Sequence, residues 1–186
     1  MVLLSKKDYD KMIDRLIKEG DEIRGTYEFI GRGLKTGLIK TSDVVSMFNL
    51  DMSVISTFVD AITTFKEMKV GPYDTSKYFL VIPDLKAALN HLKNDGVSSR
   101  RCVITFPPEH CFQSIQFLYR DNTVNVVCFM RSCDAIKNLP YDLWLCSFLA
   151  QLFASYIHGA GLGKPYPEHR ITFSFGSLHI YRDDVL

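Results

Sequence analysis

The sequence of 186 residues lacks the features that would assign it at once to several functional classes. Its 22 Lys and Arg residues nearly balance its 21 Asp and Glu residues, so its composition does not indicate direct binding of nucleic acid or another polyanion. Its five cysteines include no CxxC pair, which indicates neither a metal site nor a disulfide framework. Its glycines form neither a GxGxxG motif nor a P-loop, so they do not by themselves indicate a nucleotide cradle.

The sequence also lacks a long apolar run. Its first residues, Met1 to Leu4, are too few for the apolar core of a signal peptide. Its most apolar segment, residues 143–157, is interrupted by Ser147, Gln151 and Ser155 and is too short to span a membrane. We therefore expect a cytoplasmic protein without a membrane anchor.

Apolar periodicity predicts one α+β domain over residues 1–186. Helical spacing of apolar residues predicts helices at residues 5–20, 53–65, 83–96 and 143–157. The last of these is apolar on nearly every face, which predicts a helix buried on all sides. Strand-like segments occur at residues 26–30, 100–106, 114–130 and 170–181, with a hairpin turn at residues 120–122. Loop composition occurs at residues 31–37 and 159–167.

Polar residues flank the expected hairpin and the expected buried helix. Arg100 and Arg101 precede the hairpin, Arg131-Ser132-Cys133-Asp134 follows it, and the last strand contains His179 and Tyr181. Taken singly, a pair of arginines is typical of a solvated strand end, and the Arg-Ser-x-Asp run could cap the helix that follows. Taken together, these residues form a combination that a structural role alone does not explain.

This combination resembles the thymidylate synthase and deoxycytidylate hydroxymethylase family. The resemblance is carried by Arg131-Ser132-Cys133-Asp134, by Leu139-Pro140-Tyr141-Asp142 before the buried helix, and by Gly176-Ser177-Leu178-His179-Ile180-Tyr181. It extends to residues 92–101 and, more loosely, to residues 19–31. It implies a thymidylate synthase-like mixed β-sheet with packed helices and one buried central helix. It also implies a single domain, truncated at its C-terminus relative to typical members.

The resemblance implies a one-carbon transfer to C5 of a pyrimidine nucleoside monophosphate. In this family a cysteine thiolate adds to C6, and C5 then attacks the one-carbon unit of 5,10-methylenetetrahydrofolate. An alignment without gaps identifies Cys111, 20 positions before Arg131, as the nucleophile, and it puts Phe112 where the family has a histidine. A rival alignment matches residues 107–110 to the Pro-Cys-His motif of the family and would put Glu109 at the nucleophile position.

The resemblance also implies which residues bind the nucleotide. The residues expected at the 5′-phosphate are Arg24, Arg100, Arg101, Arg131 and Ser132. In the family the double arginine comes from the neighbouring subunit, which implies a homodimer. The residues expected at the base and the sugar are Gln116, Asp142, His179 and Tyr181, with Asp134 on the folate side.

Asp142 indicates which pyrimidine is bound. An asparagine at this position suits uracil, whereas a carboxylate accepts well from the 4-amino group of cytosine. We therefore expect hydroxymethylation of a cytosine nucleotide, dCMP or CMP. The general acid or base is left open between Asp60 and Glu67. Two other functions also stay open, namely methylation of dUMP and binding of a pyrimidine nucleotide without catalysis.

Overall fold

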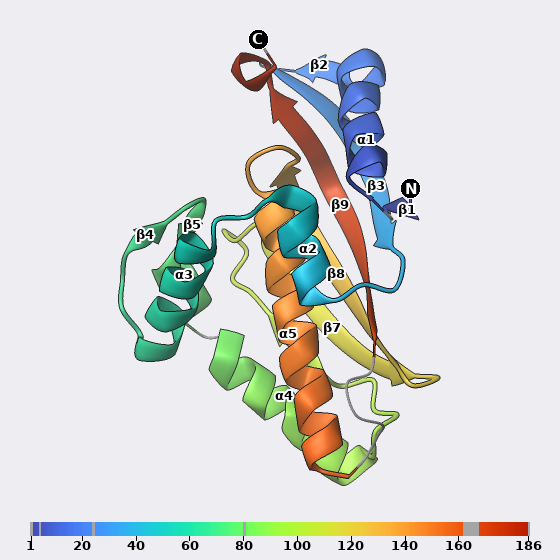
Figure 1. Ribbon diagram of the computed structural model, residues 1–186, viewed down its shortest axis with the longest axis vertical. Coiled ribbons are helices and arrows are strands. Elements are labelled where there is room, and N and C mark those ends of the chain that lie inside the picture. Colours follow the sequence, from blue (N-terminus) through green and yellow to red (C-terminus); the bar gives the residue numbers. More distant parts are fainter. Residues whose placement is uncertain (1, 4, 24, 80, 162–167, 186) are drawn as a thin grey trace.

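The computed structural model describes residues 2–3, 5–23, 25–79, 81–161 and 168–185 (Figure 1). Within these residues, one mixed sheet has the strand order β1-β3-β9-β8-β7-β6, with β2 also paired to β3. β8 and β9 run parallel, and the neighbouring β3–β9 and β7–β8 pairs are antiparallel. The strands are β1 (Val2–Leu3), β2 (Asp21–Ile23), β3 (Thr26–Thr36), β6 (Val103–Thr105), β7 (Phe112–Arg120), β8 (Thr123–Asp134) and β9 (His169–Tyr181). The expected α+β class is confirmed.

The helices cover one face of this sheet, with the long helix α5 (Leu139–Gly159) running along its middle (Figure 1). α1 (Lys6–Glu19) covers the β3 end, and α2 (Thr41–Phe48) packs against α5. α4 (Val81–Asp95) packs against β6 and α5. α3 (Met52–Thr64) lies to one side beside a small hairpin of β4 (Lys69–Val70) and β5 (Tyr73–Asp74). Two 3-10 turns, Thr75–Tyr78 and Arg182–Asp184, follow β5 and β9.

The prediction of a buried central helix is confirmed. The side chains of Leu145, Leu149 and Phe153 are fully buried, and the Phe153 ring stacks on Phe117 of β7 with 5.2 Å between centroids. α5 begins earlier than predicted, because Pro140 occupies its first turn, where the missing N–H group is not needed. The first turn of the helix is therefore buried together with the rest.

Local sequence signals at the start of α1 and at the β7–β8 turn also match the structure. The Ser5 hydroxyl caps α1 by accepting from the Asp8 N–H group at 3.3 Å. Asp121 and Asn122 adopt left-handed backbone conformations in the turn between β7 and β8, as a tight hairpin requires.

One expectation is wrong. Residues 31–37 were expected to form a loop, but β3 continues through them to Thr36 and pairs with β9 on both sides of Gly31. Gly31 has a φ of +61°, so it permits a local irregularity without ending the strand. The alternative reading of residues 131–134 as a helix cap does not hold, because they form the end of β8 beside β9.

The two faces of the sheet differ. On the face turned away from the helices, alternate side chains of the strands are exposed, including Ile30 at 61% and Phe129 at 46%. Phe129 lies in register between Ser114 of β7 and Ser174 of β9. Within the described residues this face is therefore an uncovered surface of hydroxyl and apolar side chains.

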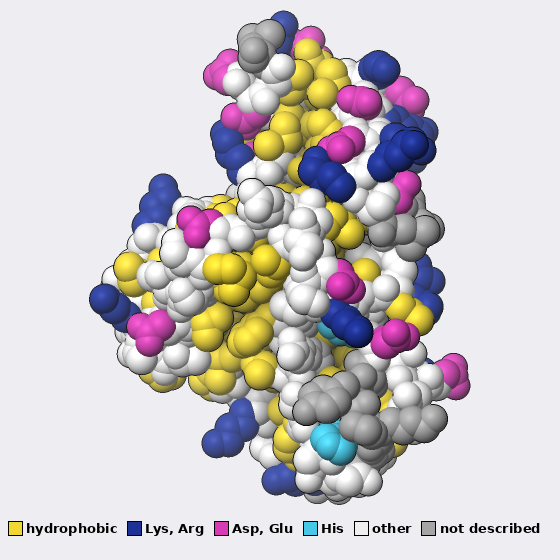
Figure 2. Space-filling view, viewed as in Figure 1, with side chains coloured by type: hydrophobic (Ala, Val, Ile, Leu, Met, Phe, Trp, Pro, Cys, Tyr) yellow, Lys and Arg dark blue, Asp and Glu magenta, His cyan; other side chains and the backbone are white. Residues whose placement is uncertain are grey.

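The helical side of the molecule carries mixed charge. Basic and acidic side chains alternate around α1 (Figure 2), where Lys6 pairs with Asp10 and Arg15 pairs with Glu19. Among the described residues, no helix has the length and apolar character needed to cross a membrane.

The burial of α5 gives a stability prediction. Leu145→Ala removes a fully buried side chain from this helix and should lower the free energy of unfolding by about 2–5 kcal/mol. Leu38→Ala truncates an exposed leucine and should change it by less than about 0.5 kcal/mol. Chemical denaturation followed by circular dichroism measures both variants. Equal effects would contradict the assignment of α5 to the core.

Candidate functional site

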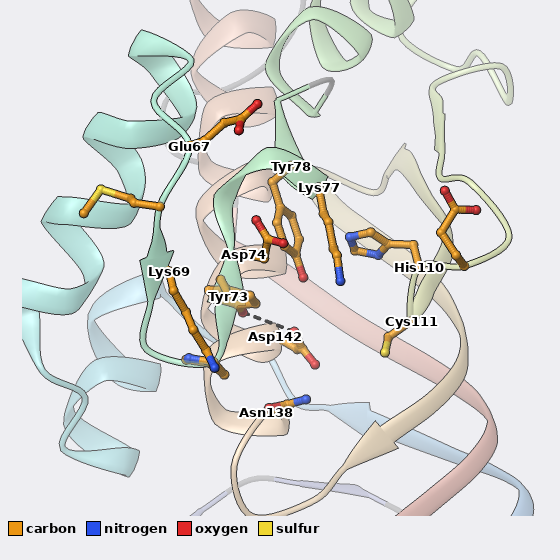
Figure 3. A pocket seen from close by; sticks show the side chains of 13 residues that line it. Glu67, Lys69, Tyr73, Asp74, Lys77, Tyr78, His110, Cys111, Asn138 and Asp142 are labelled. Carbon is orange, nitrogen blue, oxygen red and sulfur yellow. Dashed lines mark hydrogen bonds between the residues drawn. The ribbon is translucent and has the colours of Figure 1, made fainter.

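A cavity of about 650 Å³ in the described part of the chain is bounded by the β4–β5 hairpin, the turn after it, the segment before β7 and the start of α5 (Figure 3). This volume is typical of sites for small molecules. Its wall includes Lys77, Glu109, His110, Cys111, Asn138 and Asp142. In Figure 3 the Cys111 sulfur and the Asp142 carboxyl group point into the same space.

The β7–β8 hairpin holds Cys111 in place. The backbone N–H group of Arg131 donates to the Cys111 carbonyl at 2.9 Å. The Arg131 side chain donates to the carbonyls of Glu109 at 3.1 Å and His110 at 3.3 Å. Arg131 therefore fastens the segment that carries Cys111, which is itself partly exposed to the cavity.

Asp142 is a buried carboxyl group with a donor at each oxygen. It lies in the first turn of α5 and is only 3% exposed. Its Oδ1 accepts from the Tyr73 hydroxyl at 3.1 Å, and its Oδ2 accepts from the Cys133 thiol at 3.6 Å. Burial raises the pKa of Asp142 to about 7, although these two hydrogen bonds favour the charged form. Both protonation states are therefore accessible near neutral pH.

His110 is a second buried polar group of the wall. Its ring lies between Phe106 and Tyr78, with centroid distances of 4.8 and 4.7 Å. Nδ1 accepts from the Phe112 N–H group at 3.2 Å, so the proton of the neutral ring belongs on Nε2, which has no partner among the described residues. Burial lowers the pKa of His110 to about 4, so the ring is a neutral hydrogen-bond donor at physiological pH.

Aromatic rings form the side of the cavity that belongs to the hairpin. Tyr73 packs against Phe58 at 4.6 Å and against Tyr78 at 5.0 Å between centroids. The hairpin turns at Gly71, which has a φ of +53°, and a Cβ atom there would lie 2.9 Å from a methyl carbon of Val54. Glycine thus allows the hairpin to lie close to α3 and fixes the position of Tyr73.

The structure distinguishes the two candidates for the general acid or base. Glu67 lines the cavity, as do Glu109 and Cys111. Asp60 does not, because α3 turns Phe58 and Ile62 into the core and leaves Asp60 exposed on another face. Of these two carboxyl groups, the one that lines this cavity is that of Glu67.

Several residues expected at the phosphate lie outside the cavity wall. Arg100 and Arg101 are exposed before β6, where Arg101 forms an ion pair with Asp95 at 3.5 Å. The Arg100 carbonyl accepts from the Gln116 side chain at 2.8 Å. Arg24 lies outside the described residues.

The remaining candidates lie where β8 and β9 end. Ser132 is in register with Ser177 of β9, and His179 and Tyr181 follow further along that strand, outside the cavity wall. The His179 Nδ1 atom is 3.5 Å from the Ser177 hydroxyl. The rings of His179 and Tyr181 meet edge to face.

Asp134 has a visible structural role. Its Oδ1 accepts from the N–H groups of Ile136 and Lys137, both at 2.9 Å, and so caps the turn between β8 and α5. It lies outside the wall of the cavity and shapes the site by fixing the turn that leads to Asn138.

The cavity wall carries more acidic than basic side chains. Its acidic members are Glu67, Asp74, Glu109 and Asp142, and its basic lysines are Lys69 and Lys77. An anionic ligand would therefore bind more tightly if cationic side chains from outside this wall also contacted it. No group of three potential metal ligands occurs within the described parts of the chain.

No protein-family model matches this sequence, and no curated protein matches it at a significant level. The interpretation of the site therefore depends on its residues and their geometry. Sequence reasoning named Cys111 and Asp142 as candidates, and both line this cavity, whereas it assigned no role to Tyr73 or His110, which line it too. The only local signals for these two were the turn at residues 71–73 and the position of His110 beside the cysteine.

The raised pKa of Asp142 predicts a specific pH dependence of stability. The folded carboxyl group binds a proton up to about pH 7, whereas the unfolded one releases it near pH 4, so ionisation disfavours folding. The wild type should lose stability relative to Asp142→Asn as the pH rises from 4 to 7, by an amount on the order of 3–4 kcal/mol.

Denaturation curves at several pH values test this. Asp60→Asn, which removes an exposed carboxyl group, is the matched control and should follow the wild-type curve. A constant difference between Asp142→Asn and the wild type across this range would contradict the assignment.

Proposed function

We propose that this protein is a pyrimidine nucleotide C5 one-carbon transferase that hydroxymethylates a cytosine nucleotide, dCMP or CMP. The observation that carries the proposal is that Cys111 and Asp142 line one cavity, although they belong to different elements of the fold. A sulfur nucleophile facing a buried carboxyl group is the pair that this chemistry needs, one for C6 and one for the edge of the base.

In the proposed reaction, Cys111, Asp142 and His110 have different roles. The Cys111 thiolate forms a bond to C6, and the electron pair of the C5–C6 double bond moves to C5. 5,10-Methylenetetrahydrofolate, when bound, supplies the one-carbon unit that C5 attacks. The C5 proton would then leave, tetrahydrofolate would depart as a protonated amine, water would add to the new carbon, and the Cys111 sulfur would leave C6 as a thiolate. The Asp142 carboxyl group holds the base, and the unpartnered His110 Nε2–H group is a donor beside the nucleophile.

The wall also fits the cofactor chemically. Pro72, Tyr73 and Tyr78 give the hairpin side of the cavity apolar and aromatic atoms, which suit contact with the pterin ring of a folate. Glu67, at the rim, is the carboxyl group available for proton transfer through water.

Charge supports a shared site in a homodimer. The excess of carboxyl groups in the wall disfavours a phosphate unless cations come from elsewhere. Arg100 and Arg101 are exposed, and the uncovered face of the sheet displays Ile30 and Phe129. A second copy packed on that face would bury these apolar side chains and bring its arginines to the nucleotide.

One alternative has an observation in its favour. The position after the nucleophile is Phe112, which is fully buried and has no group that could transfer a proton. This feature suits a homologue that binds pyrimidine nucleotides without turnover. Methylation of dUMP is less well supported, because Asp142 offers a carboxyl group where an amide would suit uracil.

Release of tritium from C5 tests the proposal. Wild-type protein incubated with dCMP or CMP labelled at C5 should release tritium, because the addition of the thiolate makes the C5 proton exchangeable. Cys111→Ala should release none and should still bind the nucleotide. Cys102→Ala removes a buried thiol away from the cavity and serves as the matched control. Nucleotide binding without release by the wild type would favour the non-catalytic alternative.

A mixed-subunit experiment tests the shared site. Cys111→Ala and the double variant Arg100→Ala/Arg101→Ala should each be inactive as homodimers. Co-expressed in equal amounts, they form heterodimers with one intact site, so roughly a quarter of wild-type activity should return. Failure of the mixture to recover activity would show that each chain uses its own arginines or none.

A further inference from the structure

The two oxygens of the Asp142 carboxyl group have different donors. Oδ1 faces the Tyr73 hydroxyl, whereas Oδ2 faces only the Cys133 thiol, a weak donor at 3.6 Å. Figure 3 shows the bond from Tyr73 reaching one oxygen, while the other points into the cavity. When the carboxyl group carries a proton, Oδ1 is therefore held as an acceptor and the proton belongs on Oδ2.

Tyr73 is placed to keep this arrangement. It is 3% exposed, and its ring is packed by Phe58 and Tyr78. Burial and the neighbouring Asp142 raise the pKa of Tyr73 well above its usual range, so its hydroxyl is a donor at all physiological pH values. Its hydrogen bond to Oδ1 is the only one found for this hydroxyl within the described residues.

The position of the proton matters because cytosine and uracil present opposite patterns. Cytosine offers an acceptor at N3 and an amino donor at position 4, whereas uracil offers a donor at N3 and an acceptor at O4. A protonated carboxyl group free to carry its proton on either oxygen can match both bases. A carboxyl group with its proton fixed on one oxygen matches one of them and sets donor against donor in the other.

We propose that Tyr73 is a specificity-determining residue, which fixes the proton-bearing oxygen of Asp142 so that the site accepts cytosine and rejects uracil. This inference rests on the proposed function. In it, the amino group at position 4 donates to Oδ1, the oxygen that Tyr73 keeps as an acceptor, and N3 accepts from Oδ2. Tyr73 does not contact the reacting atoms and acts by positioning the proton of Asp142.

Calorimetric titration with dCMP and dUMP tests the proposal in five proteins. The wild type should prefer dCMP, and Tyr73→Phe, which retains the packed ring, should lower the ratio of dCMP to dUMP affinity by about tenfold. Tyr119→Phe removes a hydroxyl and its 2.6 Å hydrogen bond to Asn122 from outside the cavity wall, and it should retain the wild-type ratio. In an Asp142→Ala background, Tyr73→Phe should leave the ratio unchanged, because no carboxyl proton is there for Tyr73 to position.

The outcomes separate this inference from the proposed function. A wild-type preference for dCMP that Tyr73→Phe retains would overturn the role of Tyr73 and leave the proposed function standing. An equal loss of selectivity in Tyr73→Phe and Tyr119→Phe would mean that the loss does not come from the hydrogen bond to Asp142, and it would also overturn this role. If the wild type binds neither nucleotide, the proposed function fails and the inference fails with it.

Discussion

The burial of α5 is the constraint on which the rest of the structure depends. A helix that is apolar on nearly every face must be covered on all sides. The sheet covers one side, and α2 and α4 pack against others. This covering also removes the first turn of the helix from water, and with it the Asp142 carboxyl group. The raised pKa of Asp142 is therefore a result of how the whole domain packs around α5.

The elements that could be predicted from the sequence are those with strong local signals. The helix after Ser5, the hairpin turn at Asp121 and Asn122, and the buried helix are examples. The continuation of β3 past Gly31 could not be predicted, because its pairing partner β9 lies far away in the sequence. The short helix α2 was missed as well, since eight residues give little periodicity and its packing against α5 is tertiary.

The candidate site divides in the same way. Cys111 and Asp142 belong to sequence patterns, so they could be identified before the fold was known. Tyr73 and His110 could not, because their roles depend on partners that only the fold supplies, such as the Oδ1 atom of Asp142 and the N–H group of Phe112. The exposed position of Asp60 away from this cavity could not be predicted either, since a carboxyl group on a helix gives no local sign of the face it occupies.

The attachment of Arg131 to the segment before β7 has a mechanical consequence. The chain from Cys111 through β7, β8 and the first turn of α5 to Asp142 is one continuous structure, and the Arg131 side chain ties its beginning to its middle. The opposite wall of the cavity, formed by the β4–β5 hairpin, belongs to a separate stretch of sequence. Substitutions in the hairpin can therefore change which ligands fit in the cavity, while the position of Cys111 relative to Asp142 stays fixed.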